Sequence, residues 1–144
     1  MKTYLTKSAE ETIALGKKTG QNLQKGEIVC LYGELGSGKT TFIQGLAAGL
    51  GIDKRLISPT FIILRTYEIK NQTSKTLCHV DLYRIHSEDD IKGIGLDEII
   101  KNGEDIVAVE WAEKLRGLLP KKRIDIHFKP KNEERKITIE EKNE

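Results

Sequence analysis

Residues 33–40 constrain this chain most, because they fit the phosphate-binding pattern G-x-x-x-x-G-K-[ST] at every position. Glycines let such a loop turn its backbone N–H groups toward phosphate oxygens, and the helix that follows adds the partial positive charge of its amino end. The lysine, Lys39, reaches the β- and γ-phosphates, and the hydroxyl of Thr40 is a ligand of Mg²⁺. A chance match is expected on the order of once per hundred chains of this length. We therefore predict binding of a nucleoside triphosphate with magnesium.

The apolar pattern around this loop predicts one α/β domain over residues 1–144, with the last few residues disordered. Its expected fold is a P-loop NTPase-like three-layer domain whose central mixed sheet includes antiparallel strands. Two capping boxes begin at Ser8 and Ser87, and helices or helical turns are expected over 8–23, 39–50, the segment after 87, 96–101 and 113–118. Strands are expected over 27–32, 60–69, 75–83, 105–110, 123–128 and 135–139, with the second and third joined by the turn 71–74.

Composition restricts the partners and the location. The net charge is only +2, and the one dense basic run, 121–123, is explained as well by a solvated loop, so we do not expect the chain to bind DNA or RNA directly. The amino end has no apolar signal region, and no stretch approaches the roughly 18 apolar residues of a membrane span. We expect a cytoplasmic protein with no membrane partner. Cys30 and Cys78 lie in predicted strands and are expected to be buried, reduced thiols.

Two acidic residues are candidates to complete the magnesium site. P-loop enzymes place an acid at the end of a neighbouring strand, where it holds the water shell of the metal. Asp81 and Glu110 each end an apolar run of this form. Motif physics does not rank them, and a solvated strand end is the ordinary interpretation of either one alone.

Three further residues near these motifs have open roles. Thr60 follows the P-loop helix where a GTPase has its switch threonine, so it either senses the γ-phosphate or is an ordinary turn hydroxyl. Trp111 either belongs to the core or flanks the nucleotide. His79 alternates with apolar neighbours and is interpreted as a structural histidine rather than a ligand or a base.

The motifs that are missing favour ATP hydrolysis. GTPases recognise guanine with [NT]-K-x-D, which does not occur, and this favours ATP. No arginine-rich lid and no evident base for a phosphoryl acceptor are present, which favours hydrolysis over transfer to a small molecule. Two alternatives stay open: a small-molecule or nucleoside kinase, and an ATP-gated interaction module with negligible hydrolysis.

Taken together, the motifs resemble the TsaE family, formerly called YjeE. The resemblance runs in order from about residue 8 to residue 139 and rests on four segments: G-E-L-G-S-G-K-T-T at 33–41, S-P-T-F at 58–61, H-V-D-L-Y-R at 79–84 and V-E-W at 109–111. The P-loop alone is generic, whereas the other segments at these separations are specific. Glu34 and Ser37 depart mildly from the usual P-loop of the family, in a loop that works through backbone N–H groups.

The resemblance implies an ATPase of tRNA N6-threonylcarbamoyladenosine synthesis that acts with TsaD and TsaB on position 37 and meets tRNA through that complex. It implies that Glu110 is the magnesium partner, that Asp81 is a catalytic or switch residue, and that Trp111 lies close to the nucleotide. We expect Thr40 and Glu110 to hold Mg²⁺, and Lys39, Asp81, Glu110 and Thr60 to act in catalysis. The residues expected to bind ATP are Gly33, Glu34, Leu35, Gly36, Ser37, Gly38, Lys39, Thr40, Thr41 and Trp111.

Overall fold

The computed structural model describes residues 1–34, 36–52, 64–69 and 76–143. In chain order its elements are β1 (Lys2–Thr6), α1 (Ala9–Gln21), β2 (Ile28–Tyr32), α2 (Lys39–Gly49), β3 (Leu64–Glu68), β4 (Thr76–Asp81), α3 (Glu88–Gly93), α4 (Leu96–Asn102), β5 (Ile106–Glu110), the 3-10 helix η1 (Ala112–Leu118), β6 (Arg123–Lys131) and β7 (Glu134–Lys142). The described strands form one seven-stranded sheet in the order β1-β7-β6-β2-β5-β4-β3.

The sheet is mixed, as expected. Strands β6, β2, β5 and β4 run parallel to one another in its centre. The antiparallel pairs β3–β4, β6–β7 and β1–β7 extend it on both sides. Parallel strands bring their carboxyl ends to one edge of the sheet, so the loop after β2 and the ends of β4 and β5 meet there.

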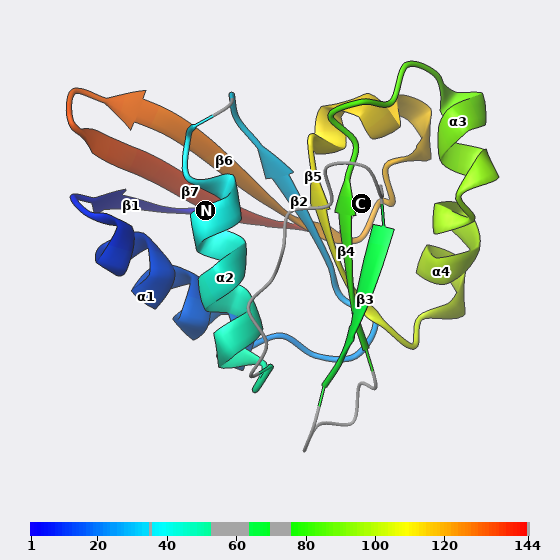
Figure 1. Ribbon diagram of the computed structural model, residues 1–144, viewed down its shortest axis with the longest axis horizontal. Helices are drawn as coiled ribbons and strands as arrows, with labels where there is room; N and C mark the ends of the chain where they lie inside the picture. Colours follow the sequence, from blue (N-terminus) through cyan, green and yellow to red (C-terminus); the bar gives the residue numbers. More distant parts are fainter. Residues whose placement is uncertain (35, 53–63, 70–75, 144) are drawn as a thin grey trace.

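Helices cover both faces of the sheet and make the fold three-layered (Figure 1). Residues that alternate along a strand point to opposite faces, so each central strand supplies two cores. Val29 and Leu31 of β2 pack with α2 in the first core, whereas Ile28 and Cys30 pack in the second core with α3, α4 and η1. Burial in these cores raises the pKa values of the Cys30 and Cys78 thiols to about 12, and both cysteines are free, as expected.

Helices α1 and α2 touch backbone to backbone. A methyl group at Gly16, Gly20, Gly45 or Gly49 would lie 2.1 to 2.2 Å from a backbone oxygen of the opposite helix. Real side chains do not approach that closely, so only glycine permits this crossing. Since α2 begins at the P-loop, the contact with α1 fixes the helix that carries the loop.

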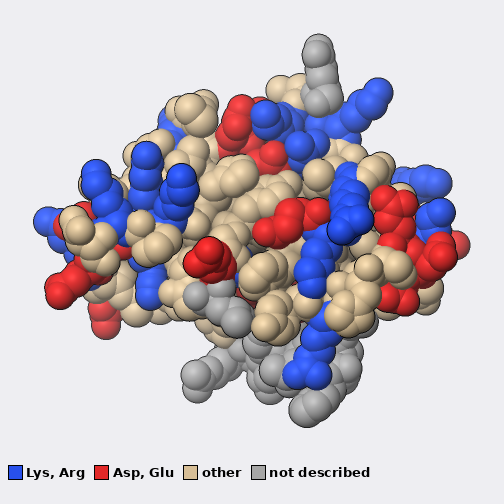
Figure 2. All heavy atoms as spheres, turned by 90° about the horizontal axis from the view of Figure 1, so that it is seen from above, with Lys and Arg blue, Asp and Glu red and all other residues tan. Residues whose placement is uncertain are grey.

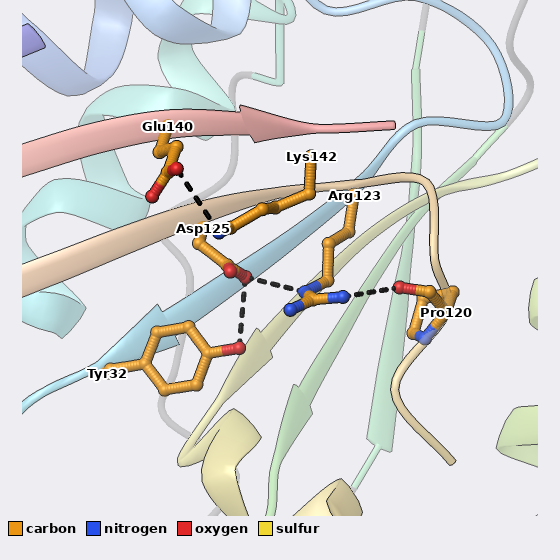
Figure 3. A network of polar contacts seen from close by, with 6 residues as sticks. All are labelled: Tyr32, Pro120, Arg123, Asp125, Glu140 and Lys142. Carbon is orange, nitrogen blue, oxygen red and sulfur yellow. Dashed lines mark hydrogen bonds and ion pairs between the residues drawn. The ribbon is translucent and has the colours of Figure 1, made fainter. Parts of the chain in front are cut away.

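On the face of the sheet that carries the second core, a polar network connects β2 to β6 (Figure 3). The Tyr32 hydroxyl and Arg123 Nε both donate to Asp125 Oδ1, each at 2.9 Å, and Arg123 Nη1 donates to the carbonyl of Pro120 at 2.9 Å. The Tyr32 ring also stacks on His127, with 4.5 Å between ring centroids. Asp125 is buried, so these donors satisfy a carboxylate that would otherwise be costly inside the protein.

The observed elements agree with most of those expected from the sequence. Both capping serines accept the predicted backbone bond: Glu11 N donates to Ser8 Oγ at 3.1 Å, and Asp90 N donates to Ser87 Oγ at 3.3 Å. Strand β1 was not predicted, and β6 and β7 extend beyond the expected ends at 128 and 139. The start of the expected strand 60–69 and the turn 71–74 lie outside the described residues. Within the described part of the chain, no helix is long and apolar enough to cross a membrane.

Candidate nucleotide site

The P-loop joins the end of β2 to the start of α2 through a turn that depends on glycine. Gly36 and Gly38 have φ values of 76° and 102°, which disfavour any residue with a side chain. Gly38 is the N-cap of α2, and no side chain of the described residues caps the helix there. The Ser37 side chain is buried, and its Oγ has no hydrogen-bond partner among the described residues. The loop therefore presents donors that protein groups do not satisfy.

Lys39 lies inside this loop rather than in solvent. Its side chain is only 5% exposed, and its Nζ donates to the carbonyl of Gly33. The same nitrogen lies 3.7 Å from the centroid of the Trp111 ring. Burial lowers the pKa of Lys39, and the nearby carboxylates of Glu110, Glu113 and Asp81 oppose that shift. The ammonium is thus held within the loop, close to the backbone of the P-loop.

Glu110, the last residue of β5, connects the P-loop helix to the neighbouring strand. It is 3% exposed. Thr40 Oγ1 donates to its Oε1 at 3.3 Å, and His79 Nε2 donates to its Oε2 at 2.8 Å. The structure thereby brings together the two side chains that the sequence analysis assigned to magnesium, Thr40 and Glu110.

Asp81 ends β4 directly beside Glu110, its partner in the parallel register. Its Oδ1 accepts a hydrogen bond from Tyr83 N at 3.0 Å. Burial raises the pKa of Asp81, and the charge of Glu110 adds to the shift, while the bond from Tyr83 N and the charges of His79 and Lys39 oppose it. A carboxyl group with a raised pKa accepts a proton more readily than a solvated one.

The two-residue period of the strands explains why these groups share one face. Leu77 of β4 and Ala108 of β5 both belong to the core against α2. His79, Asp81 and Glu110 follow at even spacings, so they point to the same side as the P-loop helix. His79 was interpreted as a structural histidine, and its hydrogen bond to Glu110 is consistent with that role. The sequence analysis did not foresee that its partner would be the candidate metal ligand, although the even spacing of His79 from Asp81 was a signal for it.

Trp111 covers the loop from the side of β5. Its backbone is left-handed, with a φ of 59°, which turns the chain sharply between β5 and η1. Its ring lies 5.1 Å from the Tyr83 ring, centroid to centroid, and Lys114 Nζ donates to the backbone carbonyls of Tyr83 and Ile85. This cluster places Trp111 beside Lys39, and its expected position near the nucleotide stays a prediction.

For three of the residues expected in the site, the structure gives no contact with the other site residues. Leu35 and Thr60 lie outside the described residues, so their expected roles stay predictions. Thr41 lies in the first turn of α2 and is partly buried. Within the described ranges, no group of three or more His, Cys, Asp or Glu side chains forms a metal cage. P-loop magnesium does not require one, since phosphate oxygens and water supply most of its ligands.

Comparisons with known proteins identify the family of the chain. A family model described as threonylcarbamoyl adenosine biosynthesis protein TsaE matches residues 6–137. The chain is 41% identical over 137 residues to the tRNA threonylcarbamoyladenosine biosynthesis protein TsaE of Bacillus subtilis, covering 94% of this chain and 83% of the relative. It is 37% identical over 125 residues to the TsaE of Treponema pallidum, covering 87% and 89% of the two chains.

A solved structure supports the same assignment. The crystal structure of Bacillus subtilis YdiB superimposes with a TM-score of 0.73 at 32% sequence identity and covers 96% of this chain and 83% of that one. The family match spans the P-loop, the strands that carry Asp81 and Glu110, all of β6 and the first part of β7. The chain therefore belongs to the TsaE family of threonylcarbamoyl adenosine biosynthesis proteins.

Proposed function

We propose that this protein binds ATP with Mg²⁺ at the P-loop and hydrolyses it as a cytoplasmic component of tRNA N6-threonylcarbamoyladenosine synthesis at position 37, together with TsaD and TsaB. The whole chain, residues 1–144, acts as a single ATPase domain. The observation that carries the proposal is the Thr40–Glu110 contact beside a buried Lys39, because this juxtaposition is what a P-loop needs to hold a metal-bound triphosphate. Membership of the TsaE family supports the pathway.

The residues present fit the ligand. Gly36 and Gly38 adopt positive φ values that suit a tight glycine loop, and the buried Ser37 Oγ lacks a described partner. In the proposal, the triphosphate is bound by the loop residues Gly33, Glu34, Leu35, Gly36, Ser37, Gly38, Lys39, Thr40 and Thr41. Magnesium, when bound, neutralises phosphate charge, and Thr40 and Glu110 hold it directly or through water.

The remaining residues position the reacting groups. Lys39 Nζ, which donates to a loop carbonyl here, turns its protons to the β- and γ-phosphate oxygens. Asp81, with its raised pKa, orients the attacking water and accepts its proton, and Thr60 reports the γ-phosphate. His79 keeps Glu110 in place, and Trp111 flanks the nucleotide.

We propose slow hydrolysis by the chain alone and faster or gated hydrolysis with its partners. The sequence offers no arginine clearly placed to stabilise the transition state, and P-loop proteins often receive that group in trans. Steady-state ATPase rates measured with and without a TsaD–TsaB complex test this idea. Equal rates in the two conditions would contradict the stimulation.

The site assignment is tested with Lys39→Ala, which removes the ammonium from the loop. Hydrolysis should fall to background, whereas the matched control Lys25→Ala, which loses only an exposed pair with Glu104, should keep the wild-type rate. Unchanged ATPase activity in Lys39→Ala would refute the assignment. Analysis of the product of γ-labelled ATP separates the alternatives: a phosphorylated small molecule indicates a kinase, and no product in a single turnover with partners indicates a gated interaction module.

A further inference from the structure

Arg135 of β7 lies across the P-loop although it is 97 positions away from it in the sequence of 144 residues. A Cβ atom at Gly38 would lie 2.8 Å from Arg135 Cδ, 3.0 Å from Nε and 3.5 Å from Nη1. The arginine side chain thus occupies the space that the missing side chain of Gly38 leaves. Gly38 is also the N-cap of the helix that begins at Lys39.

The strand register explains this position. Arg135 pairs with Thr6 of β1 and with Pro130 of β6, near the end of the sheet where the parallel strands finish. Ile137, two residues further along β7, is buried in the core against α2. Arg135 therefore points to the same face as the P-loop helix.

The charge of Arg135 has no protein partner in the described part of the chain. No described residue forms a hydrogen bond or ion pair with its guanidinium, although the side chain is partly buried. A partly desolvated guanidinium is stabilised by an anion, and its planar fork matches phosphate oxygens. The buried, unpartnered Ser37 Oγ in the same loop is a second, independent group that protein contacts leave unsatisfied.

The arginine and the acids approach the loop from opposite sides. Strand β2, which leads into the loop, lies between β5 and β6. Glu110 and Asp81 end β5 and β4 on one side, whereas Arg135 comes from the β6–β7 hairpin on the other. Figure 2 shows this upper face, with acidic side chains near the middle and a cluster of lysine and arginine side chains toward the end that holds the hairpin.

We propose that Arg135 binds the phosphates of the nucleotide from the β6 side of the P-loop. The inference rests on the proposed nucleotide site and assigns that site a second cation beside Lys39. Because Arg135 lies on the side away from Glu110 and Asp81, it strengthens nucleotide binding and does not act on the attacking water. Its loss therefore raises Kd and KM and changes kcat little.

The test measures binding by calorimetry with three ligands in the presence of magnesium: ATP, ADP and inorganic tripolyphosphate. Arg135→Ala should weaken all three by about 10- to 100-fold, the value of a lost charge-assisted hydrogen bond. Arg135→Lys, which keeps the positive charge but not the planar guanidinium, should lose less affinity. Lys136→Ala is the matched control, since this exposed neighbour points to the other face of β7, and it should bind like the wild type.

The outcomes separate this inference from the proposed function. Wild-type binding of ATP with unchanged affinities in a folded Arg135→Ala or Arg135→Gln protein would overturn the role of Arg135 and leave the nucleotide site intact. A loss with ATP and ADP but not with tripolyphosphate would overturn phosphate binding and show that the guanidinium contacts the nucleoside. Failure of the wild type to bind any of the three would overturn both proposals. Thermal melting of each variant confirms that it is folded.

Discussion

Replacing Gly45 with alanine is the sharpest test of how α1 supports the P-loop helix. The new methyl group would lie 2.1 Å from the carbonyl oxygen of Ile13, so the two helices must separate by about 1 Å to reach an ordinary contact. Both groups in this clash are rigid, one backbone oxygen and one Cβ, so no side-chain rotation relieves it. Overpacking of this kind costs up to about 3 kcal/mol.

Part of that cost is recovered, because alanine is about 1 kcal/mol better than glycine in a helix interior. The expected net loss is about 2 kcal/mol, which for a domain of this size lowers Tm by about 4 to 8 °C. Urea unfolding followed by circular dichroism measures the loss in the free energy of unfolding, and thermal melting measures the change in Tm. The substitution lies six residues beyond Lys39 on the same helix, so the movement of α2 should also weaken ATP binding.

Gly93→Ala is the matched control for this experiment. Gly93 also lies in a helix, its φ is not positive, and nothing lies within 4 Å of the position that its Cβ would take. The free energy of unfolding of the Gly93→Ala protein should stay within about 0.5 kcal/mol of the wild-type value or rise slightly. A Gly45→Ala protein that is as stable as Gly93→Ala would refute the backbone contact between α1 and α2.

Three further predictions follow from the buried polar groups. Tyr32→Phe removes a donor to a buried carboxylate and should lower the free energy of unfolding by about 1 to 2 kcal/mol in urea titrations; no change would mean that the network is dispensable. Iodoacetamide at pH 8 should leave Cys30 and Cys78 unlabelled in the folded protein, because both are buried with a pKa of about 12, and mass spectrometry should detect two adducts only after unfolding. His79→Ala deprives Glu110 of its 2.8 Å donor and should weaken magnesium-dependent ATP binding more than His79→Gln does, as titration calorimetry will show.

The features that could be predicted from the sequence are those formed by neighbouring residues along the chain. The P-loop, the two serine caps and the central apolar strands each occupy a few consecutive residues, so their pattern is visible without knowledge of the fold. Strand β1 was missed because it is short, mostly exposed and held by pairing with β7, about 135 residues away. Pairings of that span leave no local pattern.

The same distinction applies to the site. The sequence named Asp81 and Glu110 but did not show that the two residues face each other across β4 and β5. A shift of one residue in that register would turn one carboxylate to the opposite face and separate it from the P-loop. The contact of His79 with Glu110 depends on the same register. The alternation of His79 with apolar neighbours in the sequence could not show that contact, and His79 was therefore interpreted as a structural histidine.

The P-loop of the candidate site is formed by consecutive residues, whereas the groups around the loop come from distant parts of the sequence. Glu110 reaches Thr40 across 70 positions of sequence, and Arg135 reaches Gly38 from the last strand. Each of these contacts holds a charged group inside the protein, where it costs stability unless a partner or a ligand satisfies it. The backbone contact of α1 with α2 and the two cores offset that cost and keep the loop between its acids and its arginine. Binding of a polyanion with its metal should then stabilise the fold as well as fill the site, since it supplies a counter-charge to Arg135 and a hydrogen-bond partner to Ser37 Oγ, neither of which the described residues provide.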